Sequence, residues 1–406
     1  MPEPQFARKA AENRSTSAGM LPLLQVMGVV LLGFATIGLG LTTLPVHLHD
    51  GLKFAPFIVG VVSGAQFCAA IVTRFWAGNL SDRKGAHVAV RIGLALAVAS
   101  GAFYCFSVFA VTDRLNALVL LLIGRTLLGG AESLIITGGI AWGLGLVSRE
   151  RHGKAISWVG MAMFAALAFG GPMGGWLYEQ LGFAPIAIAT FLAPCLLLIL
   201  TSAMPTVPAV RTQRGGIVKV MRAVALPGFA FALSGMTYGA MITFITLLFA
   251  DRQWTGQTLA FSLFSICLIV ARLVGGGLPD RVGGARLAKW CLLLQAAGLL
   301  LIYLAPELTV ALLGVAATGM GFSLVFPSLG LEAMKRSPPD ARGMAMGLYN
   351  AYLDISLGLF SPALGLAAQW FGFEAVFLLS AVAAASAIPL VSLMTSRTEV
   401  SELAVT

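Results

Sequence analysis

Twelve long apolar stretches follow one another along this chain of 406 residues. They lie at roughly 22–46, 55–79, 87–110, 117–147, 154–180, 183–203, 225–250, 256–279, 287–305, 308–334, 343–371 and 373–395. About 20 apolar residues allow an α-helix to cross the hydrocarbon core of a bilayer, whereas an open sheet would leave backbone groups unpaired in lipid. Charged residues make up only 11% of the chain, less than half of the roughly 25% found in a soluble domain. The sequence therefore predicts an all-α membrane protein with twelve transmembrane helices.

Two copies of a short motif indicate that the chain consists of two similar halves. Six residues of the first copy recur 198 positions later: Arg74, Gly78, Leu80, Asp82, Arg83 and Gly85 match Arg272, Gly276, Leu278, Asp280, Arg281 and Gly283. A second set, 190 positions apart, pairs Pro172, Gly175 and Gly182 with Pro362, Gly365 and Gly372. We expect two pseudo-symmetric six-helix bundles, residues 1–203 and 223–406, joined by a basic cytoplasmic linker of residues 204–222. Transporters built from such parallel repeats bind substrate between the halves, near the membrane midplane.

The basic residues predict how the helices are oriented. With the N-terminus placed inside, twenty of the 26 Lys and Arg residues fall on the cytoplasmic side, and the outer loops receive only Lys53, Arg114 and Arg252. An excess of basic residues is typical of cytoplasmic loops. We therefore expect a multi-pass protein of the bacterial inner membrane with both termini in the cytoplasm. The net charge of +9 then reflects topology and contact with anionic membrane lipid, and we expect no nucleic-acid partner.

Three motifs together resemble those of the major facilitator superfamily. The segment Gly78-Asn79-Leu80-Ser81-Asp82-Arg83-Lys84-Gly85 is similar to the family signature between helices 2 and 3, and Arg125-Thr126-Leu127-Leu128-Gly129-Gly130 is similar to its helix 4 motif. The segment Gly170-Gly171-Pro172-Met173-Gly174-Gly175 resembles the helix 5 motif of proton-coupled antiporters, the drug and sugar efflux branch. The resemblance covers the whole chain and implies two six-helix bundles that rock about a central cavity. Glu132 departs from the family pattern, which usually has a small residue there.

The repeated motif is a candidate conformational latch, made by Gly78, Asp82, Arg83, Gly85, Asp280 and Arg281. The resemblance implies that Asp82 helps to close the cytoplasmic side in one conformation. We expect Asp82 to lie near a helix start, where the helix dipole favours a carboxylate. The alternative is a capping Asp in a basic loop, without a role in closure.

The helix 5 motif, Gly171, Pro172 and Gly175, places a proline among glycines in the membrane. Proline interrupts the helical hydrogen bonds and kinks the helix, so this position offers a bend that can pack closely against a neighbour. The resemblance implies that helix 5 meets helix 11 here, at Pro362. A packing kink without a role in transport is the alternative.

Ionisable side chains within membrane helices are rare and mark functional sites. Glu132 and Asp354 lie near the centres of the fourth and eleventh stretches, and Arg125 lies seven residues before Glu132, two turns away on the same face. Burial disfavours the charged form of a carboxyl group and so permits protonation near physiological pH, whereas a nearby Arg opposes this effect. Glu132, Asp354 and Arg125 are therefore proton-coupling candidates, and a static buried ion pair is the alternative.

Four further residues are candidates for a substrate cavity of mixed polar and aromatic character: Gln66, Tyr238, Asn350 and Tyr352. Ser and Thr in these helices are weaker candidates, because their hydroxyls also bond to the backbone. The sequence His47-Leu48-His49-Asp50 is short, and we expect it to be exposed and to bind no metal. We find no nucleophile elbow, phosphate loop or zinc-protease motif, and therefore expect neither an enzyme nor a cofactor.

These features predict a secondary active transporter that moves a small organic solute by alternating access. We expect a monomer that uses the proton gradient as its energy source and exports its substrate in exchange for protons. Import or facilitated diffusion of a sugar or organic acid by the same fold is one alternative. A membrane sensor that transports nothing is an alternative of a different class.

Overall fold

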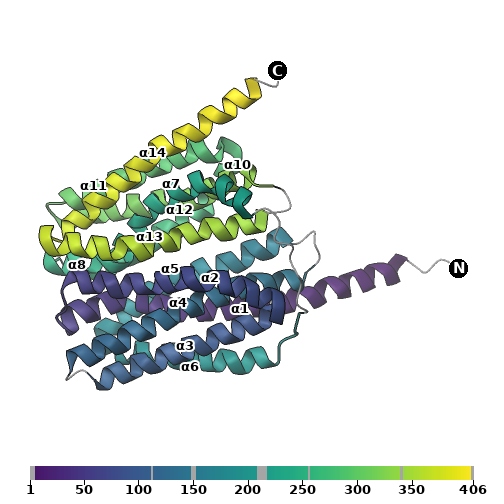
Figure 1. Cartoon of the computed structure of the whole chain (residues 1–406), viewed down its shortest axis with the longest axis horizontal. Coiled ribbons are helices and arrows are strands. Elements are labelled where there is room, and N and C mark those ends of the chain that lie inside the picture. Colours follow the sequence, from purple (N-terminus) through teal and green to yellow (C-terminus); the bar gives the residue numbers. More distant parts are fainter. Residues whose placement is uncertain are drawn as a thin grey trace. The chain divides into compact units, whose positions relative to one another are not determined.

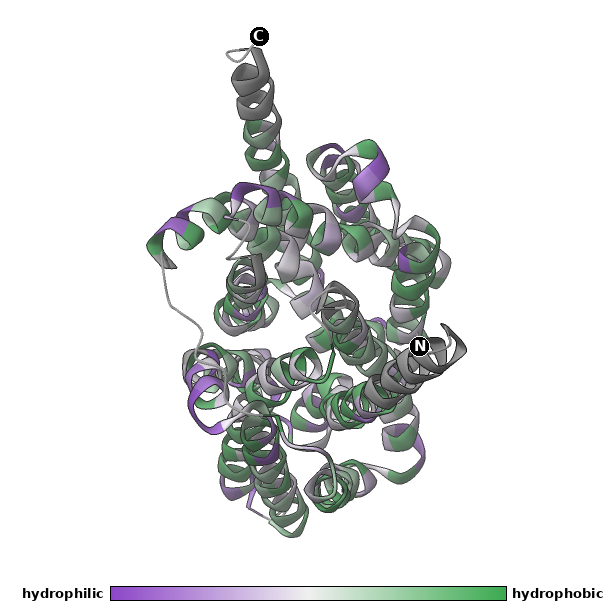
Figure 2. Ribbon diagram, turned by 90° about the vertical axis from the view of Figure 1, so that its right-hand side faces the viewer, coloured by the Kyte–Doolittle hydropathy of each residue, from purple (hydrophilic) through white to green (hydrophobic). Residues whose placement is uncertain are grey.

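The computed structural model describes residues 5–110, 113–147, 152–207, 217–254, 257–338 and 342–403. Residues 208–216 of the predicted linker lie outside this part of the chain. The described residues form helices and short connections, without a strand. Apolar residues cover most of the helices, and hydrophilic residues are confined to short stretches (Figure 2).

The helices follow the order and the lengths that the apolar stretches predict (Figure 1). In the first half they are α1 (Gln5–Val46) with the π-helical turn η1 (His47–Gly51), α2 (Pro56–Lys84), α3 (Ala86–Phe109), α4 (Arg114–Gly145), α5 (His152–Leu181) and α6 (Ala184–Ser202). In the second half they are α7 (Ile217–Thr243), α8 (Ile245–Asp251), α9 (Gln257–Gly275), α10 (Leu278–Val282), α11 (Gly284–Leu304), α12 (Leu308–Arg336), α13 (Arg342–Phe371) and α14 (Phe373–Leu403).

Eleven of the described helices are long and apolar enough to cross a membrane, and the shorter apolar helix Leu259–Gly275 occupies the eighth place in the predicted order. The prediction of an all-α membrane protein with this helix order is thereby confirmed. Two predicted stretches are each divided in two. The seventh is interrupted at Phe244, between α7 and α8. The helix of the eighth ends at Gly275, the first of three consecutive glycines that precede Leu278 and Pro279, and glycine and proline disfavour a continuous helix.

The backbone repeats with the sequence. All four described glycines with a positive φ form two repeat-related pairs: Gly85 (φ 100°) with Gly283 (93°), and Gly182 (75°) with Gly372 (87°). In each case the glycine amide donates to the carbonyl oxygen four residues earlier, at 2.9–3.1 Å. Residues with a side chain rarely adopt a positive φ, whereas glycine does so without steric cost. The glycines of the repeat therefore end helices at matching places in both halves.

Contacts between residues divide the chain into two compact units. Unit 1 comprises Met1–Gly38, Val72–Gly170 and Ala184–Thr212, and unit 2 comprises Leu39–Ile71, Gly171–Phe183 and Gln213–Thr406. Helices α1, α2 and α5 thus contribute to both units. We call Leu39–Ile71 and Gly171–Phe183 the distal segments, because they lead to the helix ends opposite the basic loops. The predicted bundle boundaries at residues 203 and 223 stay a prediction.

Unit 1 is held by close helix packing at small residues. A Cβ on Gly101 of α3 would lie 2.4 Å from the backbone nitrogen of Phe191 of α6, so the two helices touch backbone to backbone, as small residues permit in membranes. The start of the linker is bound to the same unit, because the Trp142 indole donates to the Pro205 carbonyl oxygen at 3.0 Å. The Arg91 guanidinium also donates to the Thr201 carbonyl oxygen at 2.6 Å.

Candidate functional site

The predicted ionisable residues of unit 1 lie on helix α4. Arg125 and Glu132 are both buried, with 1% and 9% of their surface exposed. Arg125 lies beside the buried hydroxyl of Tyr104 of α3. The ring of Tyr104 approaches α4 closely at Gly124, where a Cβ would lie 2.7 Å from it. Glycine at this position therefore lets Tyr104 reach the neighbouring arginine.

The predicted ionisable residue of unit 2, Asp354, lies on α13 and is 5% exposed. Gly358 and Ser361, four and seven residues further along, share its helix face. Both contact α2: a Cβ on Gly358 would lie 2.9 Å from the Cys68 sulfur, and a Cβ on Gly60 would lie 2.3 Å from the Ser361 carbonyl oxygen. Asp354 thus continues the face of α13 that packs on the distal segment of α2.

Helices α2 and α13 run antiparallel in this contact. Gly60 of α2 lies against Ser361, Gly64 lies against Gly358 and Pro362, and the backbone at Pro56 lies against Gly365. The small residues spaced by four on α2 therefore allow close approach, as their spacing predicts.

The predicted cavity residues lie on three helices of unit 2. Gln66 on α2 is fully buried, and Asn350 and Tyr352 on α13 are half-buried. The ring of Tyr352 packs on α7, where a Cβ on Gly228 would lie 2.3 Å from it. Tyr238 on α7 stacks on Phe322 of α12, with ring centroids 5.5 Å apart and an interplanar angle of 8°.

The sequence did not predict the aromatic cluster to which Tyr238 belongs. It is formed by rings from helices α7, α9, α12 and α13: Phe231, Tyr238, Phe261, Phe264, Phe322, Phe326 and Tyr349. Arg272 of α9 lies at one end of it, with its guanidinium carbon 5.9 Å from the centroid of the Phe326 ring. The same guanidinium donates to the Ser323 carbonyl oxygen at 2.8 Å.

The helix 5 motif lies in a tight crossing of helices. A Cβ on Gly171 would lie 2.2 Å from the Phe261 ring of α9, and a Cβ on Gly174 would lie 2.3 Å from the Leu39 carbonyl oxygen of α1. The resemblance implies a contact of this motif with helix 11 near Pro362. The contacts that the structure describes at these residues are with other helices: Gly171 meets α9, and Pro362 meets α2 at Gly64. The contact with helix 11 that the resemblance implies stays a prediction.

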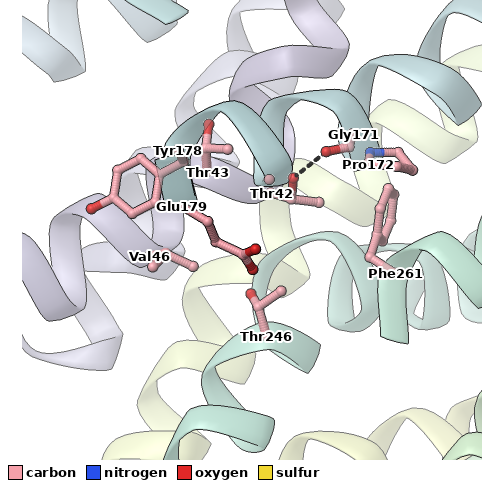
Figure 3. A pocket seen from close by; sticks show the side chains of 10 residues that line it. Thr42, Thr43, Val46, Gly171, Pro172, Tyr178, Glu179, Thr246 and Phe261 are labelled. Carbon is pink, nitrogen blue, oxygen red and sulfur yellow. Dashed lines mark hydrogen bonds between the residues drawn. The ribbon is translucent and has the colours of Figure 1, made fainter. Parts of the chain in front are cut away.

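A pocket of about 240 Å³ lies beside this crossing, within unit 2 (Figure 3). Its lining comes from both distal segments and from α8 and α9: Thr42, Thr43, Val46, Gly171, Pro172, Gly175, Tyr178, Glu179, Thr246 and Phe261. The Thr42 hydroxyl donates to the Gly171 carbonyl oxygen at 3.1 Å. The Glu179 carboxylate points towards the Thr246 side chain (Figure 3). The pocket thus includes Gly171, Pro172 and Gly175 of the predicted motif and residues that the sequence did not single out.

The two copies of the predicted latch differ in local structure. Asp82 lies in the last turn of α2, immediately before Arg83 and Lys84. The expectation that Asp82 lies near a helix start is therefore wrong, because α2 continues through Gly78 and ends only at Lys84, before Gly85. In the second copy, Asp280 lies in the first turn of α10, where the helix dipole favours a carboxylate.

The remaining latch residues differ in burial. Gly78 is half-buried, Arg83 and Arg281 are exposed, and Gly85 is buried beside the start of the linker, because a Cβ there would lie 3.3 Å from the Val207 carbonyl oxygen. The role of these residues as a latch stays a prediction.

The histidines at the end of α1 have separate partners. The His47 ring stacks on Phe183 at 4.4 Å between centroids, and His49 Nδ1 lies 3.0 Å from the Phe54 carbonyl oxygen. The described residues contain no group of three or more His, Cys, Asp or Glu side chains that could hold a metal ion.

Comparison with known proteins identifies the family. The model of the Major Facilitator Superfamily matches residues 26–361 and, in a second match, 228–405. The chain belongs to the major facilitator superfamily. An uncharacterized transporter of this type from Salmonella typhimurium is 36% identical over 376 residues, which cover 92% of this chain and 96% of the relative. The recognition of the family from its motifs is thus confirmed.

Solved structures of other major facilitator transporters share the fold. A variant of the nucleoside transporter NupG has a TM-score of 0.72 at 17% identity, covering 92% of this chain and 99% of that one. The D-xylose-proton symporter has a TM-score of 0.72 at 15% identity, covering 90% and 96%. The chain is therefore a multi-pass membrane transporter of small molecules, and the prediction that it is not an enzyme is confirmed by its family.

Proposed function

We propose that this major facilitator transporter exports a small organic solute in exchange for protons, by alternating access. The observation that carries the proposal is the division of α1, α2 and α5, whose distal segments pack with the second half of the chain while their remainders pack in unit 1. The described distal contacts at Gly60, Gly64 and Gly171 are made by glycines against backbone or rings. Such surfaces fit closely and have no interlocking side chains, so they suit a gate that closes and separates.

Proton coupling is assigned to the buried carboxyl groups. Glu132 and Asp354 are each less than one-tenth exposed within membrane-spanning helices, where ionisable residues are retained for function. Asp354 lies on the face of α13 that contacts α2, so its protonation state can favour one arrangement of this contact. A proton drives the change only if it binds the two conformations with different affinity. The helix 5 motif, which lines the pocket shown in Figure 3, supports antiport because it resembles the motif of proton-coupled antiporters.

The orientation follows from the basic loops. We place the distal segments at the outer face of the bacterial inner membrane and both termini in the cytoplasm, with anionic lipid at the basic loops. We further propose that the protein works as a monomer, because each chain carries both six-helix halves. Fusion of a reporter that is active only in the cytoplasm to the C-terminus tests the orientation, and loss of its activity would contradict it.

Import or facilitated diffusion remains the second candidate. The D-xylose-proton symporter has the same fold as this chain, and hydroxyl-bearing aromatics such as Tyr238 and Tyr352 suit a sugar or an organic acid. The sensor considered from the sequence has no support from the family, whose members transport solutes.

Proteoliposomes exposed to a mixture of small metabolites separate these functions. With an acidic interior, an antiporter accumulates its solute as protons leave, whereas a symporter does so only with an acidic exterior. Mass spectrometry of the washed vesicles identifies the solute in either case. Equal uptake under both gradients would indicate a facilitator, and no uptake above empty vesicles would contradict transport of the tested solutes.

A further inference from the structure

We propose that the pocket beside the helix 5 motif, which we call the distal pocket, is a binding site for small organic ammonium ions. These ions hold the distal gate closed, where the distal gate is the set of contacts that the distal segments make with α9 and α13. The pocket has about 240 Å³ of space between the distal segments and helices α8 and α9. The part of the proposal that concerns the gate rests on alternating access, whereas binding itself does not.

The pocket wall combines a carboxylate with aromatic rings. The Glu179 carboxylate provides the charge, and the rings of Tyr178 and Phe261 stand on either side of the labelled lining (Figure 3). Carboxylates pair with cations, and aromatic faces attract quaternary and other ammonium groups electrostatically. A mostly apolar pocket with a few converging polar groups is the usual form of a small-molecule site.

The pocket wall also contains a buried hydroxyl group, that of Thr246. Thr246 is 6% exposed, lines the pocket, and its Oγ1 atom has no hydrogen-bond partner among the described residues. A buried polar atom without a partner costs free energy, so a bound group that supplies the missing hydrogen bond is favoured at this place. Because Thr246 points towards Glu179 (Figure 3), its hydroxyl can accept a hydrogen bond from an ammonium or hydroxyl group held there.

A second carboxylate lies near one lining residue. Asp50 is close enough to the Tyr178 hydroxyl to act on it electrostatically, and the His47 ring lies 3.4 Å from the same hydroxyl. The pocket lining itself contains Glu179 and no Lys or Arg, so its charge favours a cation over an anion.

The link to the gate follows from where the lining comes from. Thr42 and Glu179 belong to the distal segments, whereas Thr246 and Phe261 belong to α8 and α9. Separation of these elements would take the pocket walls apart, so a ligand that fills the pocket stabilises the closed arrangement by mass action. By reciprocity, a change that opens the gate lowers the affinity of the pocket for the ligand.

Binding of choline to the purified protein, measured by titration calorimetry, tests the proposal. The control ligand is the uncharged isostere of choline in which a carbon replaces the nitrogen. We expect saturable binding of choline and at least tenfold weaker binding of the isostere. Equal binding of the two, or no binding of choline, would overturn the proposal.

Matched variants locate the site. Glu179→Gln and Thr246→Val should each weaken choline binding, the former at least tenfold, whereas Glu307→Gln, an exposed carboxyl at the start of α12, should not change it. Circular dichroism and thermal unfolding confirm that each variant is folded. Wild-type choline affinity in both folded pocket variants would contradict the assignment, whatever the outcome of the transport assay.

Discussion

Replacing Gly60 by alanine should open the distal gate. The added Cβ would lie 2.3 Å from the Ser361 carbonyl oxygen and 3.0 Å from its carbonyl carbon, whereas ordinary van der Waals contact begins at 3.4 Å. The atoms in the way are backbone atoms, so α2 must move by about 1 Å relative to α13. Overpacking of this kind costs about 1–3 kcal/mol, which corresponds to a shift of about 5- to 150-fold in the equilibrium between closed and open gates.

Spin labels at the distal helix ends measure this shift. Phe57 on α2 and Trp370 on α13 are exposed, and the backbones near them meet at Gly365. Double electron–electron resonance in nanodiscs, on a chain without its native cysteines, should show a short distance for the closed gate and a longer distance for the open gate. Gly60→Ala should lower the ratio of the short-distance population to the long-distance population at least fivefold.

A second glycine on α13 provides the control. Gly347 has no atom within 4 Å of an added Cβ, so Gly347→Ala brings the same helix-stabilising change without a clash. Its distance distribution should match that of the wild type. An unchanged distribution in folded Gly60→Ala would refute the claim that this contact closes the gate.

Two further substitutions and one double-mutant cycle test the packing and the polar contacts. Gly182→Ala meets no neighbour but requires a positive φ of 75°, so it should lower the free energy of unfolding by about 1–2 kcal/mol; an unchanged melting temperature would contradict this. Gln295→Leu removes the acceptor of the Ser234 hydroxyl, which lies 2.9 Å away, and should lower the free energy of unfolding by about 1–3 kcal/mol. Denaturant unfolding measures this change, and an unchanged free energy would contradict a stabilising role of this hydrogen bond. The exposed Arg252–Glu374 pair should contribute only about 0.2–1 kcal/mol in a double-mutant cycle, and a coupling well above this would show a larger role at the gate.

The fold could be predicted because its main determinant, the length of the apolar stretches, is local in sequence. The repeat in the sequence is matched by backbone detail that was not predicted, since Gly85 and Gly283 share a positive φ and the same amide hydrogen bond. The position of Asp82 was mispredicted because the glycines of the motif suggested a turn, whereas α2 continues as a helix through Gly78 to Lys84.

The candidate site was predicted less completely, because one sequence does not show which way a helix faces. Tyr238 was recognised as a polar aromatic, but its stacking on Phe322 depends on how α7 and α12 pack. Glu179 was missed because it is an exposed carboxylate near the end of α5, a place where such a residue has no special signal in the sequence. Its place beside Thr246 follows from the distal segment packing on α8, which no local pattern indicates.

The most direct test of proton-coupled transport is solute-driven proton movement in proteoliposomes that contain a pH-sensitive dye. We predict that a transported solute changes the internal pH with the wild-type protein. Glu132→Gln or Asp354→Asn should abolish this change while solute exchange at equal pH continues. Wild-type proton movement in both variants would contradict the account.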